Sequence, residues 1–255
     1  QAAPAQFRRL AAAAAKQPAA GDGPVQRVVL DSWVLATDEQ TGKAPGKSVL
    51  TPVLSERYFL PDGTFRTLER RGEPLDSRGR VGDPSPRTIA GSADSDETFD
   101  GPDEGPDYAD GLPTEPEALE RSLIPDPAEC DGALAACLVS RLAFLQYNYV
   151  LKPATAEALW LMLARQTEFA YVGETRDRLD RPAVAFTSAA SDDSRKLVLL
   201  ADPKTGALMG SEEVLVRDSS QLGLKAPAVI EFVALSSRER IAADKVPDPS
   251  LSTVY

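Results

Sequence analysis

Histidine is absent from this sequence, and its absence excludes many kinds of catalytic site. A chain without imidazole has no Ser-His-Asp triad, no Cys-His pair, no histidine-ligated zinc and no histidine general base. The GxGxxG, Walker A, HExxH and CxxC motifs are missing as well. Carboxylates are plentiful, so an acid pair of the glycosidase kind stays open as an alternative. We predict a protein that is not an enzyme, has no catalytic residues and needs no cofactor.

Long apolar runs are also missing. No stretch approaches the roughly 20 consecutive apolar residues that span a membrane, and residues 1–20 lack the apolar core of a signal peptide. The hydrophobic fraction of 42% is nevertheless too high for a disordered chain. A length of 255 residues allows one large domain or two small ones, and we expect a single domain over residues 1–255.

Basic residues are few, with 28 Lys and Arg against 39 Asp and Glu, so that the formal net charge is −11. Such a surface repels a phosphate backbone, and we expect no nucleic-acid partner. Eight of the acids lie in residues 91–110, which contain no Lys or Arg, and without these eight the net charge falls to −3. The acidic run belongs to a stretch rich in Pro and Gly, residues 72–113, which we predict to be a long surface loop or insert without regular core elements. Whether the run binds calcium, a partner or nothing stays open, because its spacing does not match an EF-hand loop.

The chain has two cysteines, Cys130 and Cys137. On a single helix, a separation of seven residues would place them ~10 Å apart, beyond the roughly 7 Å limit for a disulfide. A disulfide therefore requires Cys130 to lie in a loop that folds back onto the following helix. We predict this disulfide, with two free thiols as the alternative. Two cysteines without histidine are too few soft ligands for a metal site, so we predict no metal.

The periodicity of the apolar residues predicts an α+β fold. Helical spacing covers residues 4–15, 132–149 and 153–167, and another helix follows the expected N-cap Thr114. Extended runs cover residues 25–37, 48–60, 64–70, 182–187, 196–200, 207–216 and 228–235. The alternating acids and arginines of residues 174–181 are expected to form surface ion pairs on a hairpin. We predict a strongly curved antiparallel β-sheet (a half-barrel) of about seven strands, wrapped around two or three helices.

Three short motifs resemble a known family. LPTEPEAL (112–119) resembles "LPTDPDAL", DRPAVA (180–185) resembles "GRPGVAV", and ADPKTGALMG (201–210) resembles "DPxTGxLLG" of an actinobacterial family of membrane-anchored extracytoplasmic proteins. The motifs follow the family's order and span most of the chain. The acidic run and the cysteine pair are not part of the family's pattern.

The resemblance implies a location and a general role. Family members have a cytoplasmic N-terminal stretch, one membrane helix and an external domain. This chain would be the external domain, extracytoplasmic and attached to the membrane only through an anchor that it lacks. Their genes often lie near those of extracytoplasmic-function sigma factors, which implies envelope sensing. The expected fold also resembles the half-barrel of LolA-, LppX- and RseB-like proteins, in which a curved sheet wraps helices and can hold a lipid.

Three functions follow from this reading. The first is a non-catalytic extracytoplasmic binding or sensory domain that recognises an envelope protein or ligand. The second is a carrier of a lipid or another hydrophobic small molecule. Its concave binding face would be lined by Trp33, Leu35, Phe144, Trp160 and Phe186. The third is an accessory subunit of a larger envelope complex, docked through residues 72–113. An apolar cavity would favour the carrier, whereas a solid core would leave surface recognition.

Overall fold

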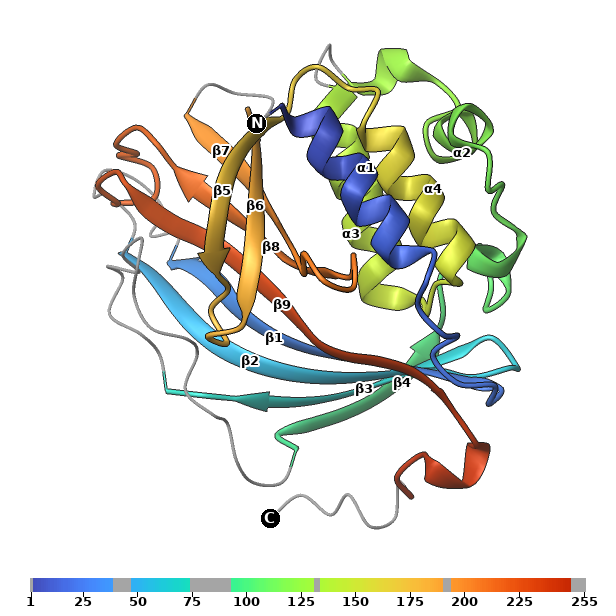
Figure 1. The fold of residues 1–255 in the computed structure, drawn as a ribbon. Coiled ribbons are helices and arrows are strands. Elements are labelled where there is room, and N and C mark those ends of the chain that lie inside the picture. The colour runs from blue at the N-terminus through green and yellow to red at the C-terminus, as the bar shows by residue number, and fades with distance from the viewer. Residues whose placement is uncertain (1, 39–46, 74–92, 131–133, 190–193, 249–255) are drawn as a thin grey trace.

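The computed structural model describes residues 2–38, 47–73, 93–130, 134–189 and 194–248. These residues form an open, curved, nine-stranded antiparallel sheet in the order β4-β3-β2-β1-β9-β8-β7-β6-β5. Figure 1 shows four helices gathered on its concave side. The strands are β1 (Val25–Asp38), β2 (Lys47–Phe59), β3 (Thr64–Arg71), β4 (Ser95–Asp100), β5 (Ala170–Arg176), β6 (Pro182–Ala189), β7 (Arg195–Ala201), β8 (Leu208–Leu215) and β9 (Ala228–Ile241). The helices are α1 (Ala3–Ala14), α2 (Pro116–Leu123), α3 (Leu134–Asn148) and α4 (Pro153–Leu163).

The sheet consists of two meanders that meet at its centre. Strands β1 to β4 pair in chain order, strands β5 to β9 pair in chain order, and β1 pairs with β9 to join the two halves. Each strand pairs with its neighbour in the chain, as is usual in antiparallel sheets, although the connection from β3 to β4 is long. Helices α2, α3 and α4 lie between the two meanders in sequence. Their buried apolar side chains pack into the core on the concave face.

Helix α1 is held by a stripe of buried apolar residues. Phe7, Leu10, Ala11 and Ala14 occur at helical spacing and face inward. The Phe7 ring stacks on Phe186 of β6, with ring centroids 4.1 Å apart. The turn after β7 packs against the same helix, since a Cβ on Gly206 (φ +69°) would lie 2.2 Å from the carbonyl oxygen of Leu10. Glycine is therefore required in this turn for both its backbone conformation and its close approach.

The predicted α+β fold with a curved antiparallel sheet is confirmed, with nine strands and four helices in place of about seven and two or three. Strands β4 and β5 were not predicted, because both are edge strands with largely exposed side chains and lack an apolar alternation. Strand β4 lies within residues 72–113, which the sequence predicts to be a long surface loop or insert without regular core elements; its side chains are largely exposed, and residues 74–92 lie outside the described part. The N-cap of α2 is Glu115 and not Thr114, since the Glu115 carboxylate accepts from the backbone N–H of Ala118 at 2.7 Å.

The two cysteines form a disulfide in the structure. Cys130 ends the short 3₁₀ helix Pro127–Cys130 ahead of α3, and Cys137 lies in the first turns of α3. Their Cα atoms are 5.8 Å apart. The arrangement is the one that helix geometry requires, with the first cysteine outside the helix that carries the second.

We expect no free thiol in the native protein when it is unfolded without a reductant. Because the disulfide closes a short loop in the unfolded chain, replacing both cysteines by serine should lower the free energy of unfolding by about 2 kcal/mol. Thiol titration and urea denaturation measure the two quantities. Two titratable thiols in the unreduced protein would contradict the assignment.

Candidate functional site

The helices cover only part of the concave face. In Figure 1 the ends of β1, β2, β8 and β9 that lie away from the helices extend beyond α1, α3 and α4. Two openings lie on this uncovered part, one of about 520 Å³ between β7 and β2 and one of about 810 Å³ over β2, β3 and β4. Arg57 lines both of them. We call the two openings together the concave groove; its lining includes Ser32, Val34, Ser55, Arg57, Thr67, Glu69, Glu97, Phe99, Tyr147, Arg195, Glu213, Glu231 and Val233.

Strand alternation decides which side chains enter the groove. On β2, Phe59 packs into the core beneath the helices, so Arg57 and Ser55 point to the same concave side. The intervening Tyr58 packs on the opposite face with Val25 and Leu68. The same strand thus contributes apolar side chains under the helices and polar ones beyond their edge.

Arg57 lies at the junction of the two openings. Its Nη1 atom reaches the carbonyl oxygen of Tyr147 and the Oδ1 atom of Asn148, both at 3.4 Å, and its buried Nε atom has no acceptor. No described carboxylate forms an ion pair with it. Burial lowers the pKa of Arg57, and the nearby charge of Glu69 opposes this shift. The guanidinium is therefore a partly desolvated cation that an incoming anion could stabilise.

Two glutamates face each other across the other end of the groove. Glu213 of β8 lies directly opposite Glu231 of β9. Arg195 of β7 binds the first, with its Nη1 atom 2.9 Å from Glu213 Oε1, while Glu231 forms no ion pair with a described residue. The limited hydration inside the groove and the charge of Glu213 raise the pKa of Glu231. Glu231 is exposed and so is positioned to receive a cation.

Tyr147 extends from the end of α3 into the groove, where its hydroxyl lies 2.5 Å from Ser211 Oγ of β8. Burial raises the pKa of Tyr147 to about 12, and the charge of Glu231 adds to this effect while Arg57 opposes it. The phenol is therefore neutral at physiological pH and lies close enough to both charges to feel them.

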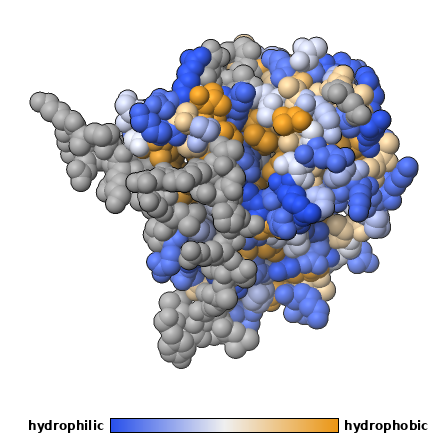
Figure 2. All heavy atoms as spheres, turned by 60° about the vertical axis from the view of Figure 1, so that its left-hand side comes forward, coloured by the Kyte–Doolittle hydropathy of each residue, from blue (hydrophilic) through white to orange (hydrophobic). Residues whose placement is uncertain are grey.

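The groove also holds exposed apolar side chains. Val34 is 51% exposed and lines the first opening, and Phe99 is 48% exposed and lines the second. Only one other large apolar side chain of the described residues, Val172 on β5, is comparably exposed. In Figure 2 the visible face is mostly hydrophilic, with small apolar patches between polar side chains. Two of the three most exposed large apolar side chains in the described part of the chain therefore line the groove.

The five residues predicted to line a ligand cavity do not lie together. Phe186 and Trp160 are buried in the core beside Phe7, and Phe144 packs at the rim of that core. Trp33 is buried with Phe232 on the face opposite the helices, and Leu35 is half-buried beside it. Of the five, only Trp33 and Leu35 border the groove. Phe186 and Trp160 fill the core around Phe7 in place of lining a cavity there.

The hairpin of β5 and β6 differs from the expectation of surface ion pairs, because two of its charged residues are buried. Its tip packs across the face opposite the helices, where the Arg178 guanidinium lies 4.7 Å from the Trp33 ring and 2.8 Å from Glu212. The buried carboxylate of Asp177 binds the side chain of Arg181, which also donates to the carbonyl oxygen of Leu235 at 2.8 Å. These charges therefore fasten the hairpin to the sheet.

Sequence reasoning did not single out the charged groove residues, although two signals were present. Arg57 occupies a position that shares its face with Phe59, and the pair Glu212-Glu213 within β8 obliges one carboxylate to face the concave side. Among the described residues, no group of three or more metal-ligating side chains gathers anywhere, including around the acids of residues 94–110. No described helix is long and apolar enough to cross a membrane.

Comparison with known proteins gives few matches. No family model matches this sequence, and no curated protein matches it. Two solved chains match the structure. One of them is MucB, from the crystal structure of MucB in complex with MucA(peri), with 14% identity and a TM-score of 0.27. The match covers 99% of this chain and 60% of MucB, so the chain spans about 60% of that protein's length. At this similarity the likeness carries no argument about function, and membership of the actinobacterial family stays a prediction.

We predict that Asp177→Asn destabilises the protein by about 2–3 kcal/mol, because it breaks a buried ion pair. Asp180→Asn is the matched control: its side chain is 82% exposed, and asparagine tolerates the positive φ of this position. The control should lie within about 0.5 kcal/mol of the wild type. Urea denaturation measures both variants, and equal effects would contradict the role assigned to the hairpin tip.

We also predict a late ionisation for Tyr147. Because its folded pKa of about 12 exceeds the ordinary value of 10.0, its neutral form stabilises the fold below pH 10, and this contribution is lost as the pH rises from 10 to 12. In an alkaline titration followed by tyrosinate absorbance, Tyr147→Phe should remove one tyrosine from the late step alone. Loss of a tyrosine from the step near pH 10 would show that Tyr147 is not buried as described.

Proposed function

We propose that this protein is a non-catalytic binding domain that works outside the cytoplasmic membrane and holds an extended segment of an envelope protein in the concave groove. The observation that carries the proposal is the coincidence of exposed apolar side chains with charges that lack ion-pair partners. Val34 and Phe99 lie in the same groove as Arg57 and Glu231. Concave surfaces that expose apolar groups beside polar anchors are typical of recognition sites.

The length of the groove favours a chain segment over a small molecule. Its lining residues extend from Arg195 on β7 to Glu97 on β4, which are six strand spacings apart. At ~4.8 Å per spacing the span is ~29 Å before curvature, a distance that roughly eight or nine extended residues cover. A small molecule would occupy a fraction of it.

The two partnerless charges define the chemistry of the segment. Arg57 lies opposite Val28 on β1, and Phe232, which neighbours Glu231, lies opposite Trp33. Glu231 is therefore level with Val34, and the two charges are about six residue lengths, or ~20 Å, apart along the strand direction. An acidic side chain near Arg57 and a basic one near Glu231 would neutralise both. Fixed charges of this kind select a partner and its direction of binding.

Two observations support an extracytoplasmic location. The Cys130–Cys137 disulfide is of the kind that persists in oxidising compartments. The three motifs that resemble the actinobacterial family imply the same compartment. The same resemblance implies attachment to the membrane through an anchor, and we include this attachment in the proposal.

The carrier function is disfavoured by the packing of the core. Phe7 stacks on Phe186, and Trp160 lies against the same ring of Phe7, so the part of the concave face around Phe7 is a packed core. The groove that remains open carries arginines and glutamates, which an acyl chain would have to desolvate. The accessory-subunit function depends on residues 72–113, of which 74–92 lie outside the described residues.

A library of random twelve-residue peptides tests the proposal. Peptides selected on the wild type should bind it at micromolar concentration. Their affinity for the Val34→Asp variant should be at least tenfold lower. The matched control is Val172→Asp, which places the same charge on another exposed strand valine and should bind like the wild type. Fluorescence anisotropy with the selected peptides measures the affinities.

The proposal is contradicted if no peptide is enriched on the wild type, or if both variants lose affinity equally. Native mass spectrometry of the purified protein adds a second criterion. A stoichiometric lipid that remains bound would favour the carrier over the peptide-binding function.

A further inference from the structure

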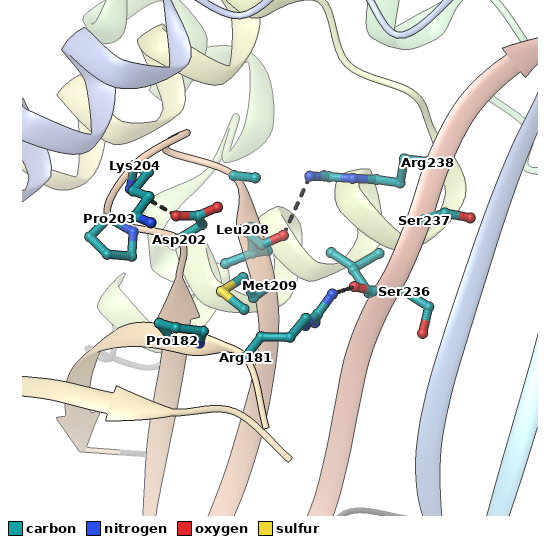
Figure 3. Close-up of a pocket in the computed structure, with 12 residues that line it drawn as sticks. Arg181, Pro182, Asp202, Pro203, Lys204, Leu208, Met209, Ser236, Ser237 and Arg238 are labelled. Atoms are coloured by element: carbon teal, nitrogen blue, oxygen red, sulfur yellow. Dashed lines mark hydrogen bonds between the residues drawn. The ribbon is translucent and has the colours of Figure 1, made fainter. Parts of the chain in front are cut away.

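A third opening, outside the concave groove, lies where the sheet splits between β8 and β9. The pairing of these strands stops at Gly210 and Ala234, whereas β9 continues to Ile241 paired with β1 alone. The turn before β8 bends toward the helices, where Trp160 donates from its Nε1 atom to the carbonyl oxygen of Gly206 at 2.7 Å. The split holds an opening of about 360 Å³, drawn in Figure 3.

Cationic groups surround this opening on a protein whose net charge is −11. Arg181, Lys204 and Arg238 line it, together with one carboxylate, Asp202. Asp202 is engaged within its own turn, where it accepts from the backbone N–H of Lys204 at 2.8 Å and from the hydroxyl of Thr205. Since Asp177 neutralises Arg181, Lys204 and Arg238 face the single carboxylate of Asp202, which leaves one excess positive charge at the opening.

Arg238 is the unusual member of this group. Its neighbours on β9 are paired: Glu239 binds Arg27, and Arg240 binds Asp110 at 2.9 Å. Arg238 has no ion pair with a described residue, and its single hydrogen bond, to the carbonyl oxygen of Leu208, is 3.4 Å long. Figure 3 shows its guanidinium directed from β9 across the opening toward Leu208. Burial lowers the pKa of Arg238 to about 10.

A mostly apolar pocket of about 300 Å³ continues inward from the same residue. It shares Ala207, Leu208 and Arg238 with the outer opening and lies below the end of α1 and the start of α4. Most of the side chains in its walls are small or apolar, and they include Ala14, Pro18, Val150, Leu151 and Ala156. Gln146 also lines it; this side chain is 97% buried, and its Oε1 atom has no hydrogen-bond donor. A half-buried arginine with one long side-chain hydrogen bond thus borders an apolar pocket, and an anion placed there could accept from its remaining donors.

We propose that this split is a ligand site for a small carboxylate with a short apolar tail, with Arg238 as the group that binds the carboxylate. Lys204 stands at the outer entrance and adds long-range attraction. The tail occupies the inner pocket, where the walls carry apolar side chains. The site is separate from the concave groove and does not depend on the function proposed for it.

Octanoate, acetate and octanol are the probes, with binding measured by isothermal titration calorimetry. Octanoate should bind the wild type at sub-millimolar concentration, and acetate and octanol should each bind at least tenfold more weakly, since each lacks one of the two recognised parts. Arg238→Gln should lower the affinity for octanoate at least tenfold. Arg141→Gln, which changes an exposed arginine of α3, is the control and should bind octanoate like the wild type.

Folding of the variant is checked by its melting temperature. Because Arg238→Gln removes a half-buried charge that has no ion pair with a described residue, the variant should melt no lower than the ligand-free wild type. Ala156→Phe fills the inner pocket and should weaken octanoate more than acetate. The proposal is overturned if the wild type does not bind octanoate, if octanol binds as tightly as octanoate, or if Arg238→Gln binds octanoate unchanged.

Discussion

The packing of Phe7 is the contact on which the arrangement of the molecule depends. Its ring lies between Trp160 of α4 and Phe186 of β6, and it meets Phe169 edge-on at 5.5 Å. One side chain near the start of the chain thereby joins α1 to a later helix and to the second meander. The burial of these aromatic rings stabilises the packing of α1 and α4 against the concave face.

The limited reach of the helices gives the two faces of the sheet different roles. Around Phe7 the concave face is a packed core, and beyond the helices it is a groove with arginines, glutamates and two exposed apolar side chains. The opposite face needs a cover of its own, which the tip of the β5–β6 hairpin supplies by placing Arg178 over Trp33. Elements of the chain thus cover much of the apolar surface on both faces of the sheet, and the uncovered part of the concave face is where a partner is proposed to bind.

Much of the fold could be predicted from the sequence, because apolar periodicity is a local signal. The helix at Phe7, the first three strands and the turn around Gly206 were found by their spacing and turn residues. Strands β4 and β5 were not predicted, because an edge strand can form without the apolar alternation of a buried face. The candidate site was not predicted for another reason. Whether Trp160 lines a cavity or fills a core depends on which helix packs against which part of the sheet. Arg57 shows the same limit, since its position on β2 was predictable and its lack of an ion-pair partner was not.

The measurement that tests the central claim most directly is backbone amide NMR of the protein during titration with a selected peptide. The groove account predicts that the largest shift changes fall on β1, β2 and β9, around Val34, Arg57 and Glu231, and that the hairpin tip around Arg178 remains unchanged. Shift changes centred on that hairpin, or on the outer edge of β5, would contradict the assignment of the concave groove as the binding surface.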